Sequence, residues 1–154
     1  MPVSLHYEKV NHPAWDDAIG TLQRYLVKQS PENVILLGDS ASRLAPHVHP
    51  TPTLLDHTTN VALYLPGNEH LVGYRDSDQL LRDIIPSRGK TILLDDFAER
   101  PDRSKSQILA AMIVRQKIKN AWVVVMVGRQ LIPGVTVLYL SDELVTLMKG
   151  NRIR

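Results

Sequence analysis

The sequence predicts a single α/β domain over residues 1–154, built around a doubly wound, mainly parallel sheet. Three short apolar runs, at residues 33–37, 91–94 and 121–127, have the length and composition of strands buried on both faces. Helical patterns separate these runs, and strands that alternate with helices are typical of a parallel sheet. Neither an internal repeat nor a low-complexity linker divides the chain.

In the first part of the chain, a helix leads into the first strand. From Trp15 to Leu26, apolar residues recur at helical spacing, with Pro13 in the first turn. Ser30 and Pro31 end this helix, because the residue before a proline disfavours helical backbone. We therefore expect one amphipathic helix that packs on the sheet.

Four weaker elements are predicted between the first and the central strand. Residues 41–48 favour a short helix, and residues 47–53 favour an extended loop because prolines are frequent there. Residues 60–65 resemble a strand. Asp76 and Ser77 then cap another short helix that leads to the central strand.

The C-terminal part of the chain continues the alternation. A helix begins at about Ser104, and its apolar face consists of Ile108, Leu109, Met112, Ile113 and Ile118. Residues 135–140 form a last strand after the one at residues 121–127. Ser141 opens a final helix that ends near Gly150.

The composition limits the classes of protein to consider. Apolar residues make up 44% of the chain and charged residues 22%, which is ordinary for a soluble globular protein. Cysteine is absent, which excludes disulfides and thiolate metal sites and agrees with a reducing compartment. No apolar run approaches the roughly 18 residues of a membrane span, and the N-terminus lacks a signal-peptide pattern. We therefore expect a cytoplasmic protein without a membrane partner.

Charge gives only weak support for a nucleic-acid partner. The formal net charge is +2, and basic residues gather in the C-terminal tail at Lys149, Arg152 and Arg154. A charge this small does not by itself indicate nucleic acid. A homo-oligomer also stays open.

The central stretch, residues 91–103 (TILLDDFAERPDR), contains the most informative acids of the chain. Its apolar part ends at Leu94, and Asp95 and Asp96 follow at once, ahead of a charged loop. In parallel sheets covered by helices, ligands bind at the carboxyl ends of the strands. We therefore expect both acids just past the strand, at the edge where such folds bind their ligands.

The run Leu93-Leu94-Asp95-Asp96 resembles the signature of the type I phosphoribosyltransferases, which is a buried strand, two acids and a loop of small residues that opens a helix. The order of elements over roughly residues 13–140 is similar to that family by pattern. The resemblance implies a glycosyltransferase of nucleotide metabolism, in which a nitrogen base attacks C1 of phosphoribosyl pyrophosphate and pyrophosphate leaves. It also implies Mg²⁺, which neutralises pyrophosphate oxygens.

The resemblance assigns roles to individual residues. The catalytic candidates, which would hold the ribose hydroxyls, are Asp95 and Asp96. The turn after the first strand would approach the pyrophosphate with Gly38, Asp39, Ser40 and Arg43. The segment that would hold the 5′-phosphate at a helix N-terminus contains Ala98, Glu99, Arg100, Arg103 and Ser104. No metal ligand is assigned.

This segment departs from the family pattern, so other classes of function stay open. It lacks the family's Thr-Gly pair, Pro101 has no N–H to donate, and Glu99 and Asp102 oppose an anion. Arg100 and Arg103 can compensate through their side chains. The alternatives are a catalytically inactive relative that binds a nucleotide or RNA and regulates, and a protein-interaction module that uses the fold as a scaffold.

Two further short motifs resemble those of other protein families, but the rest of the sequence does not meet the requirements of those families. Residues 38–40 are similar to the GDS block of the SGNH esterases, but no histidine follows His70 to act as the base. Residues 89–91 match the end of a P-loop but precede a strand, where a P-loop precedes a helix. We therefore expect ordinary turns at both places.

His47 and His49 form the remaining cluster of potential ligands. They share one face of an extended chain, and Asp56 and His57 are near in sequence. The segment suits either a metal site or an exposed proline-rich loop, of which the loop is the favoured interpretation.

Overall fold

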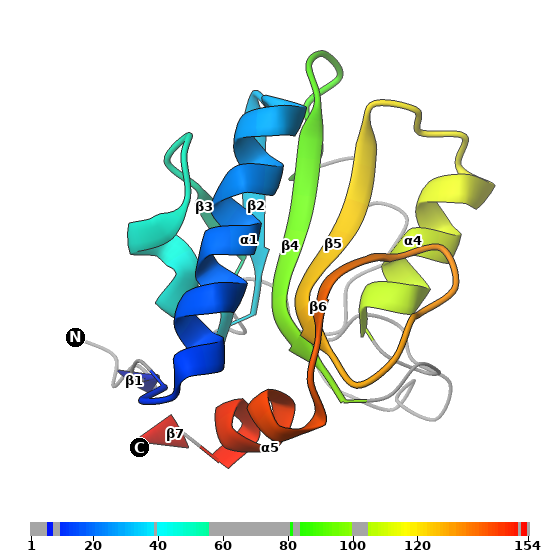
Figure 1. Ribbon diagram of the computed structural model, residues 1–154. Coiled ribbons are helices and arrows are strands. Elements are labelled where there is room, and N and C mark those ends of the chain that lie inside the picture. The colour runs from blue at the N-terminus through cyan, green and yellow to red at the C-terminus, as the bar shows by residue number, and fades with distance from the viewer. Residues whose placement is uncertain are drawn as a thin grey trace.

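In the described part of the chain, five strands form an all-parallel sheet with the strand order β3-β2-β4-β5-β6 (Figure 1). The structure is a computed structural model that describes residues 6–7, 10–38, 40–55, 81, 84–99, 105–150 and 152–153. The strands of the sheet are β2 (Asn33–Leu37), β3 (Thr53–Leu55), β4 (Thr91–Ala98), β5 (Ala121–Gly128) and β6 (Thr136–Leu140). Near the two termini, β1 (His6–Tyr7) pairs antiparallel with β7 (Arg152–Ile153).

Helices cover both faces of the sheet. One face carries α1 (Pro13–Gln29), the 3₁₀ helix η1 (Ser40–His47) and α5 (Asp142–Gly150), and the other carries α4 (Lys105–Arg115) (Figure 1). Two apolar clusters, one on each face, fill the space between these helices and the strands. This is the predicted doubly wound α/β fold.

The three strands at the centre of the sheet are the three apolar runs of the sequence. β2 pairs with β4, and β4 pairs with β5, in parallel throughout. On β4, Ile92 and Leu94 face the α1 side, whereas Leu93 faces the α4 side. Because side chains alternate along a strand, Asp96 belongs to the α1 side and Asp95 to the α4 side.

The predicted helix faces agree with the structure except at Ile118, which follows the end of α4 at Arg115 but packs against the same cluster. On α4, Leu109, Met112 and Ile113 are buried, and Ile108 is half-buried against the same cluster. The hydroxyl of Ser141 accepts a 3.0 Å hydrogen bond from the Leu144 amide and so caps the start of α5, as predicted. Among the described helices, none has the length and apolar character that a membrane span needs.

One strand was absent from the prediction. The loop predicted at residues 47–53 is present between His47, where η1 ends, and Thr53, but from Thr53 the chain forms β3 and pairs with β2. Three residues at the edge of a sheet are too few to produce a periodic signal, and nearby prolines are compatible with an edge strand. The predicted strand at 60–65 lies outside the described residues. Of the helix predicted from Asp76, the structure describes residues 81, 84 and 85, where the Ile85 amide bonds the Leu81 carbonyl.

Candidate functional site

The strand that carries the two acids is longer than the sequence predicts. Its apolar part ends at Leu94, but β4 continues to Ala98, and Asp95 pairs with Val125 of β5. The expectation that both acids follow the strand is therefore wrong, because they lie within its last four residues. Aspartate is normally disfavoured in strands, and here specific partners on each face hold the two carboxylates.

Asp96 forms a buried ion pair with Arg43. The Nε and Nη2 atoms of Arg43 donate to Oδ2 of Asp96 at 3.0 and 2.8 Å, and the Ser40 hydroxyl donates to Oδ1 at 3.0 Å. The two charged side chains are only 2% and 1% exposed. Both carboxylate oxygens thus accept hydrogen bonds inside the protein, and a ribose hydroxyl reaches Asp96 only after this pair opens.

Arg43 also connects three elements of the fold. Besides Asp96 of β4, it donates to the carbonyl of Ser40 at 3.2 Å in η1 and to the carbonyl of Met148 at 3.3 Å in α5. Its guanidinium carbon lies 6.0 Å from the centre of the Phe97 ring. These contacts fix η1 and the last turn of α5 to the carboxyl end of β4.

Asp95 occupies a different environment on the α4 side of the sheet. It is half-buried, and its Oδ2 accepts a 3.3 Å hydrogen bond from the hydroxyl of Ser106, a buried residue in the first turn of α4. Its Oδ1 accepts a 2.9 Å bond from the Asp96 amide. The carboxylate is therefore oriented between the end of β4 and the start of α4.

The turn after β2 lies at the same edge, as predicted. The register Val34↔Ile92 through Leu36↔Leu94, continued by two residues, brings Gly38 level with Asp96. Gly38 has a φ of 89°, a conformation that favours glycine, and it turns the chain from β2 into η1. The turn after β2 and the two acids at the end of β4 thus lie at the same carboxyl edge of the sheet.

The predicted phosphate segment is described only at its start. Ala98 is the last residue of β4 and is 7% exposed, packed with Val125 and Ile132. Glu99 forms an ion pair with Lys149 of α5, in which the Lys149 Nζ atom lies 2.7 Å from Oε1 of Glu99. The remaining predicted site residues lie outside the described residues: Asp39, Arg100, Arg103 and Ser104.

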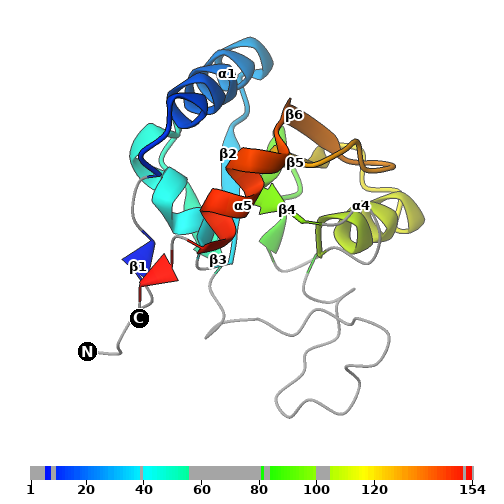
Figure 2. The ribbon, with the colours of Figure 1, turned by 60° about the horizontal axis from the view of Figure 1, so that its bottom comes forward.

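Sequence reasoning did not place α5 at this edge. Figure 2, which turns the carboxyl ends of the strands toward the viewer, shows α5 across that edge beside the end of β4. Its last turn contributes the Met148 carbonyl to Arg43 and the Lys149 ammonium to Glu99. The only sequence signal was the basic tail that begins at Lys149, and nothing in the sequence links this tail to β4.

A comparison with solved structures supports this arrangement of strands and helices. The structure is similar to the crystal structure of a purine phosphoribosyltransferase from Pyrococcus horikoshii Ot3, with a TM-score of 0.50 over 82% of each chain and 11% sequence identity. This chain has a phosphoribosyltransferase-like fold. No protein-family model and no curated protein matches its sequence. The likeness therefore concerns the fold.

Within the described part of this phosphoribosyltransferase-like fold, no three His, Asp or Glu side chains gather as a metal site. The carboxyl edge offers the Asp95 carboxylate, and His47 and His49 lie elsewhere. The ring of His47 packs edge-on against Trp15, with the ring centres 6.4 Å apart. Of the residues near the two histidines, Asp56 and His57 lie outside the described residues.

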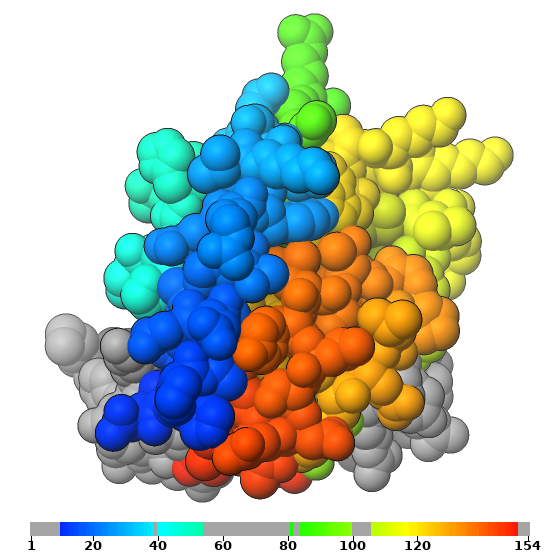
Figure 3. All heavy atoms as spheres, viewed as in Figure 1, coloured from blue at the N-terminus to red at the C-terminus, as the bar shows by residue number. Residues whose placement is uncertain are grey.

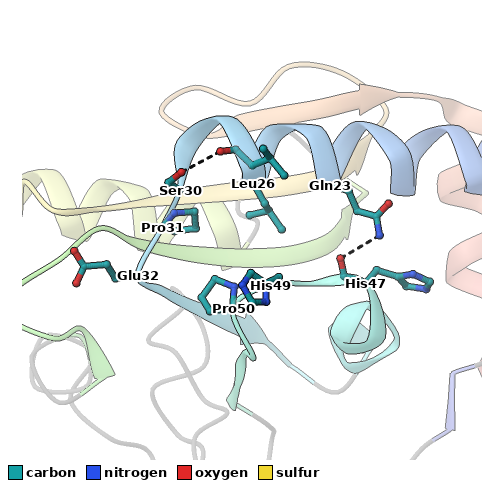
Figure 4. Close-up of a pocket in the computed structure, with 9 residues that line it drawn as sticks. Gln23, Leu26, Ser30, Pro31, Glu32, His47, His49 and Pro50 are labelled. Atoms are coloured by element: carbon teal, nitrogen blue, oxygen red, sulfur yellow. Dashed lines mark hydrogen bonds between the residues drawn. The ribbon is translucent and has the colours of Figure 1, made fainter.

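A separate groove lies beside the C-terminal end of α1. It has a volume of about 660 Å³, and Figure 4 shows Leu26, Pro31 and Pro50 on its walls and His49 near Pro50. The side-chain amide of Gln23 bonds the His47 carbonyl at 3.4 Å across it. Glu32, which also lines the groove, directly precedes β2, so the groove is at the opposite edge of the sheet from Asp95.

Proposed function

We propose that this protein binds phosphoribosyl pyrophosphate or a nucleotide at the carboxyl edge of the sheet, between the end of β4 and the first turn of α4. The observation that carries the proposal is the orientation of Asp95 by Ser106 and by the Asp96 amide. A carboxylate held in this way loses little freedom when ribose hydroxyls donate to it, so binding is less costly. The phosphoribosyltransferase-like fold supports the same class of ligand.

The anionic groups of the ligand would bind on either side of Asp95. The pyrophosphate would lie toward the turn after β2, with Gly38, Asp39 and Ser40, whereas Arg43 is buried in its pair with Asp96 and would support this turn from the inside. The 5′-phosphate would lie toward the segment after β4, and its contacts would come from Arg100, Arg103 and Ser104, while the Glu99 carboxylate pairs with Lys149. Backbone amides at a helix N-terminus favour such an anion, and arginine side chains add charge-assisted hydrogen bonds.

The donor set at this edge fits Mg²⁺ that arrives with its ligand. Mg²⁺ in proteins is commonly held by one or two carboxylates together with substrate phosphates and waters. Asp95 is a carboxylate of the required kind at the edge where the pyrophosphate would lie. We therefore expect binding of phosphoribosyl pyrophosphate to require Mg²⁺, whose role would be to neutralise the pyrophosphate oxygens.

Binding without group transfer is a second candidate, favoured by the environment of Asp96. The resemblance assigns two acids to the ribose hydroxyls, but the side chain of Asp96 is 1% exposed and is paired with Arg43. Breaking a buried pair by removing one partner costs about 3–5 kcal/mol in proteins, so the second acid is available only at a large cost. A regulator that binds the ligand would need Asp95 alone, whereas a transferase would need both acids.

Calorimetry with phosphoribosyl pyrophosphate and Mg²⁺ tests the proposal. We expect weak binding, on the order of 0.1–1 mM or about 4–5.5 kcal/mol, because acids in the phosphate segment oppose the arginines. Asp95→Asn should weaken it about tenfold or more, through the loss of one charged hydrogen-bond acceptor. The matched control is Glu32→Gln, which removes one exposed carboxylate at the opposite edge and should leave binding unchanged.

A transfer assay then separates the two candidates. Release of pyrophosphate in the presence of purine or pyrimidine bases would indicate a transferase. Binding without release would support the non-catalytic relative. No binding of phosphoribosyl pyrophosphate or of nucleoside monophosphates would exclude both and leave the protein-interaction module.

A further inference from the structure

Two contacts hold the last turn of α5 at the carboxyl end of β4. Arg43 donates to the Met148 carbonyl at 3.3 Å, and Lys149 donates to Glu99, the first residue after β4, at 2.7 Å. At the other end of α5, Arg129 bonds the Asp142 carbonyl at 3.0 Å. The helix is thus anchored at both ends along the carboxyl edge, and Lys149 has a defined place there.

The pair between Lys149 and Glu99 is accessible to a ligand. The two side chains are 51% and 44% exposed, in contrast to the buried pair of Arg43 and Asp96. Exposed ion pairs contribute little to stability, so this one can rearrange when an anion arrives. The lysine ammonium has three donors and can bond a phosphate oxygen while it still contacts Glu99.

The pair also changes the charge that an anionic ligand meets. Glu99 alone would repel a phosphate, and a like charge about 4 Å away is a substantial obstacle at a protein surface. Lys149 cancels that charge at a contact distance of 2.7 Å. It therefore supplies, from a helix 50 residues further along the chain, a cation at the start of the predicted phosphate segment.

We propose that Lys149 is an anion-binding residue of this site, which donates to a phosphate group of the ligand and releases or shares Glu99 when it does so. This inference rests on the proposed function and adds a residue that the resemblance to the phosphoribosyltransferases does not assign. It gives α5 a direct part in ligand recognition, in addition to its part in packing.

Titration of the full chain with Mg²⁺ and phosphoribosyl pyrophosphate, and separately with a nucleoside monophosphate and with inorganic phosphate, tests this inference. Lys149→Ala should weaken binding about tenfold, the usual effect of losing one charge-assisted hydrogen bond, and Lys149→Arg should restore most of it. Lys28→Ala is the matched control, because Lys28 is an exposed lysine in the last turn of α1, whose C-terminal end lies at the opposite edge of the sheet. This control should bind like the parent.

The Glu99→Gln background separates a direct contact from screening. If Lys149 bonds the ligand, Lys149→Ala weakens binding in this background too, and if it only screens Glu99, the loss disappears and the inference is overturned. Equal binding by Lys149→Ala and the parent also overturns it, while the proposed function stands. Binding of inorganic phosphate that depends on Lys149, without binding of phosphoribosyl pyrophosphate or of nucleoside monophosphates, would support the inference and reject the proposed function. Binding of none of these ligands would reject both.

Discussion

Asp95 and Asp96 are neighbours in the sequence but belong to opposite faces of the sheet, and their surroundings give them different properties. Asp96 is enclosed by η1, β4 and α5, where Arg43 and Ser40 satisfy its two oxygens. Asp95 is half-buried beside Ser106 on the α4 side. Because a strand alternates its side chains, a run of two acids in β4 has to divide its carboxylates between the two faces.

The buried pair gives a prediction about stability. Arg43→Met should lower the free energy of unfolding by about 3–5 kcal/mol, because it leaves the charge of Asp96 buried without its partner. The double variant Arg43→Met/Asp96→Leu should recover most of that loss, because apolar residues of similar volume often replace a buried pair without net cost. Urea unfolding of the parent, both single variants and the double variant measures the coupling.

Additive losses in that cycle would contradict the ion pair. In that case the double variant would be less stable than either single variant, and the two side chains would contribute independently. The exposed pair of Arg129 with Asp142 provides the comparison, since its coupling should be below about 1 kcal/mol.

At the scale of elements, α4 ends in a C-terminal capping motif in which a lysine occupies a position that favours glycine. The Ile118 amide bonds the Ile113 carbonyl, and the Lys117 amide bonds the Val114 carbonyl, both at 3.0 Å. This is the Schellman pattern, and its apolar contact is present because Ile118 packs in the same cluster as Ile113. Lys117 takes the left-handed position, with φ of 58°, where glycine is the usual residue.

Lys117→Gly should therefore stabilise the protein. Relief of the left-handed backbone contributes roughly 1–2 kcal/mol, and the greater freedom of glycine in the unfolded chain offsets part of it, so we expect a net gain of about 0.5–1 kcal/mol. Lys119→Gly, two residues further on and not left-handed, should give a loss or no change. Chemical denaturation of both variants measures this, and a gain of equal size in both would show that the lysine side chains, not the backbone, are responsible.

The elements also show which parts of the fold could be predicted from sequence. Strands β2, β4 and β5 contain short apolar runs buried on both faces, so the sequence pattern identified them as strands of a parallel sheet. β3 has three residues at the sheet edge and was not predicted, because no periodicity exists over so short a segment. β4 was predicted too short, because a local pattern cannot show that Asp96 has a partner 53 residues earlier.

At the scale of the whole molecule, the candidate site is assembled from segments far apart in the sequence. In Figure 3 the first helix and the C-terminal part of the chain share one face of the molecule, with α5 along its lower margin in that view. The acids and the turn after β2 were predictable, because both follow apolar runs at the same edge. Ser106 and Lys149 were not, because only the packing of α4 and α5 brings them to β4.

Ligand binding at that edge should raise the stability of the folded chain as a whole. At a ligand concentration ten times the Kd, linkage adds about 1.4 kcal/mol to the free energy of unfolding. For a chain of this size, that corresponds to a rise in the melting temperature of about 3–6 °C. Thermal unfolding with and without Mg²⁺ and phosphoribosyl pyrophosphate measures the rise, and sodium sulfate at the same ionic strength corrects for the general effect of anions.

Asp95→Asn should lose most of the rise because it weakens binding, whereas Glu32→Gln should keep it. An equal rise in the parent and in Asp95→Asn would place the ligand elsewhere on the molecule.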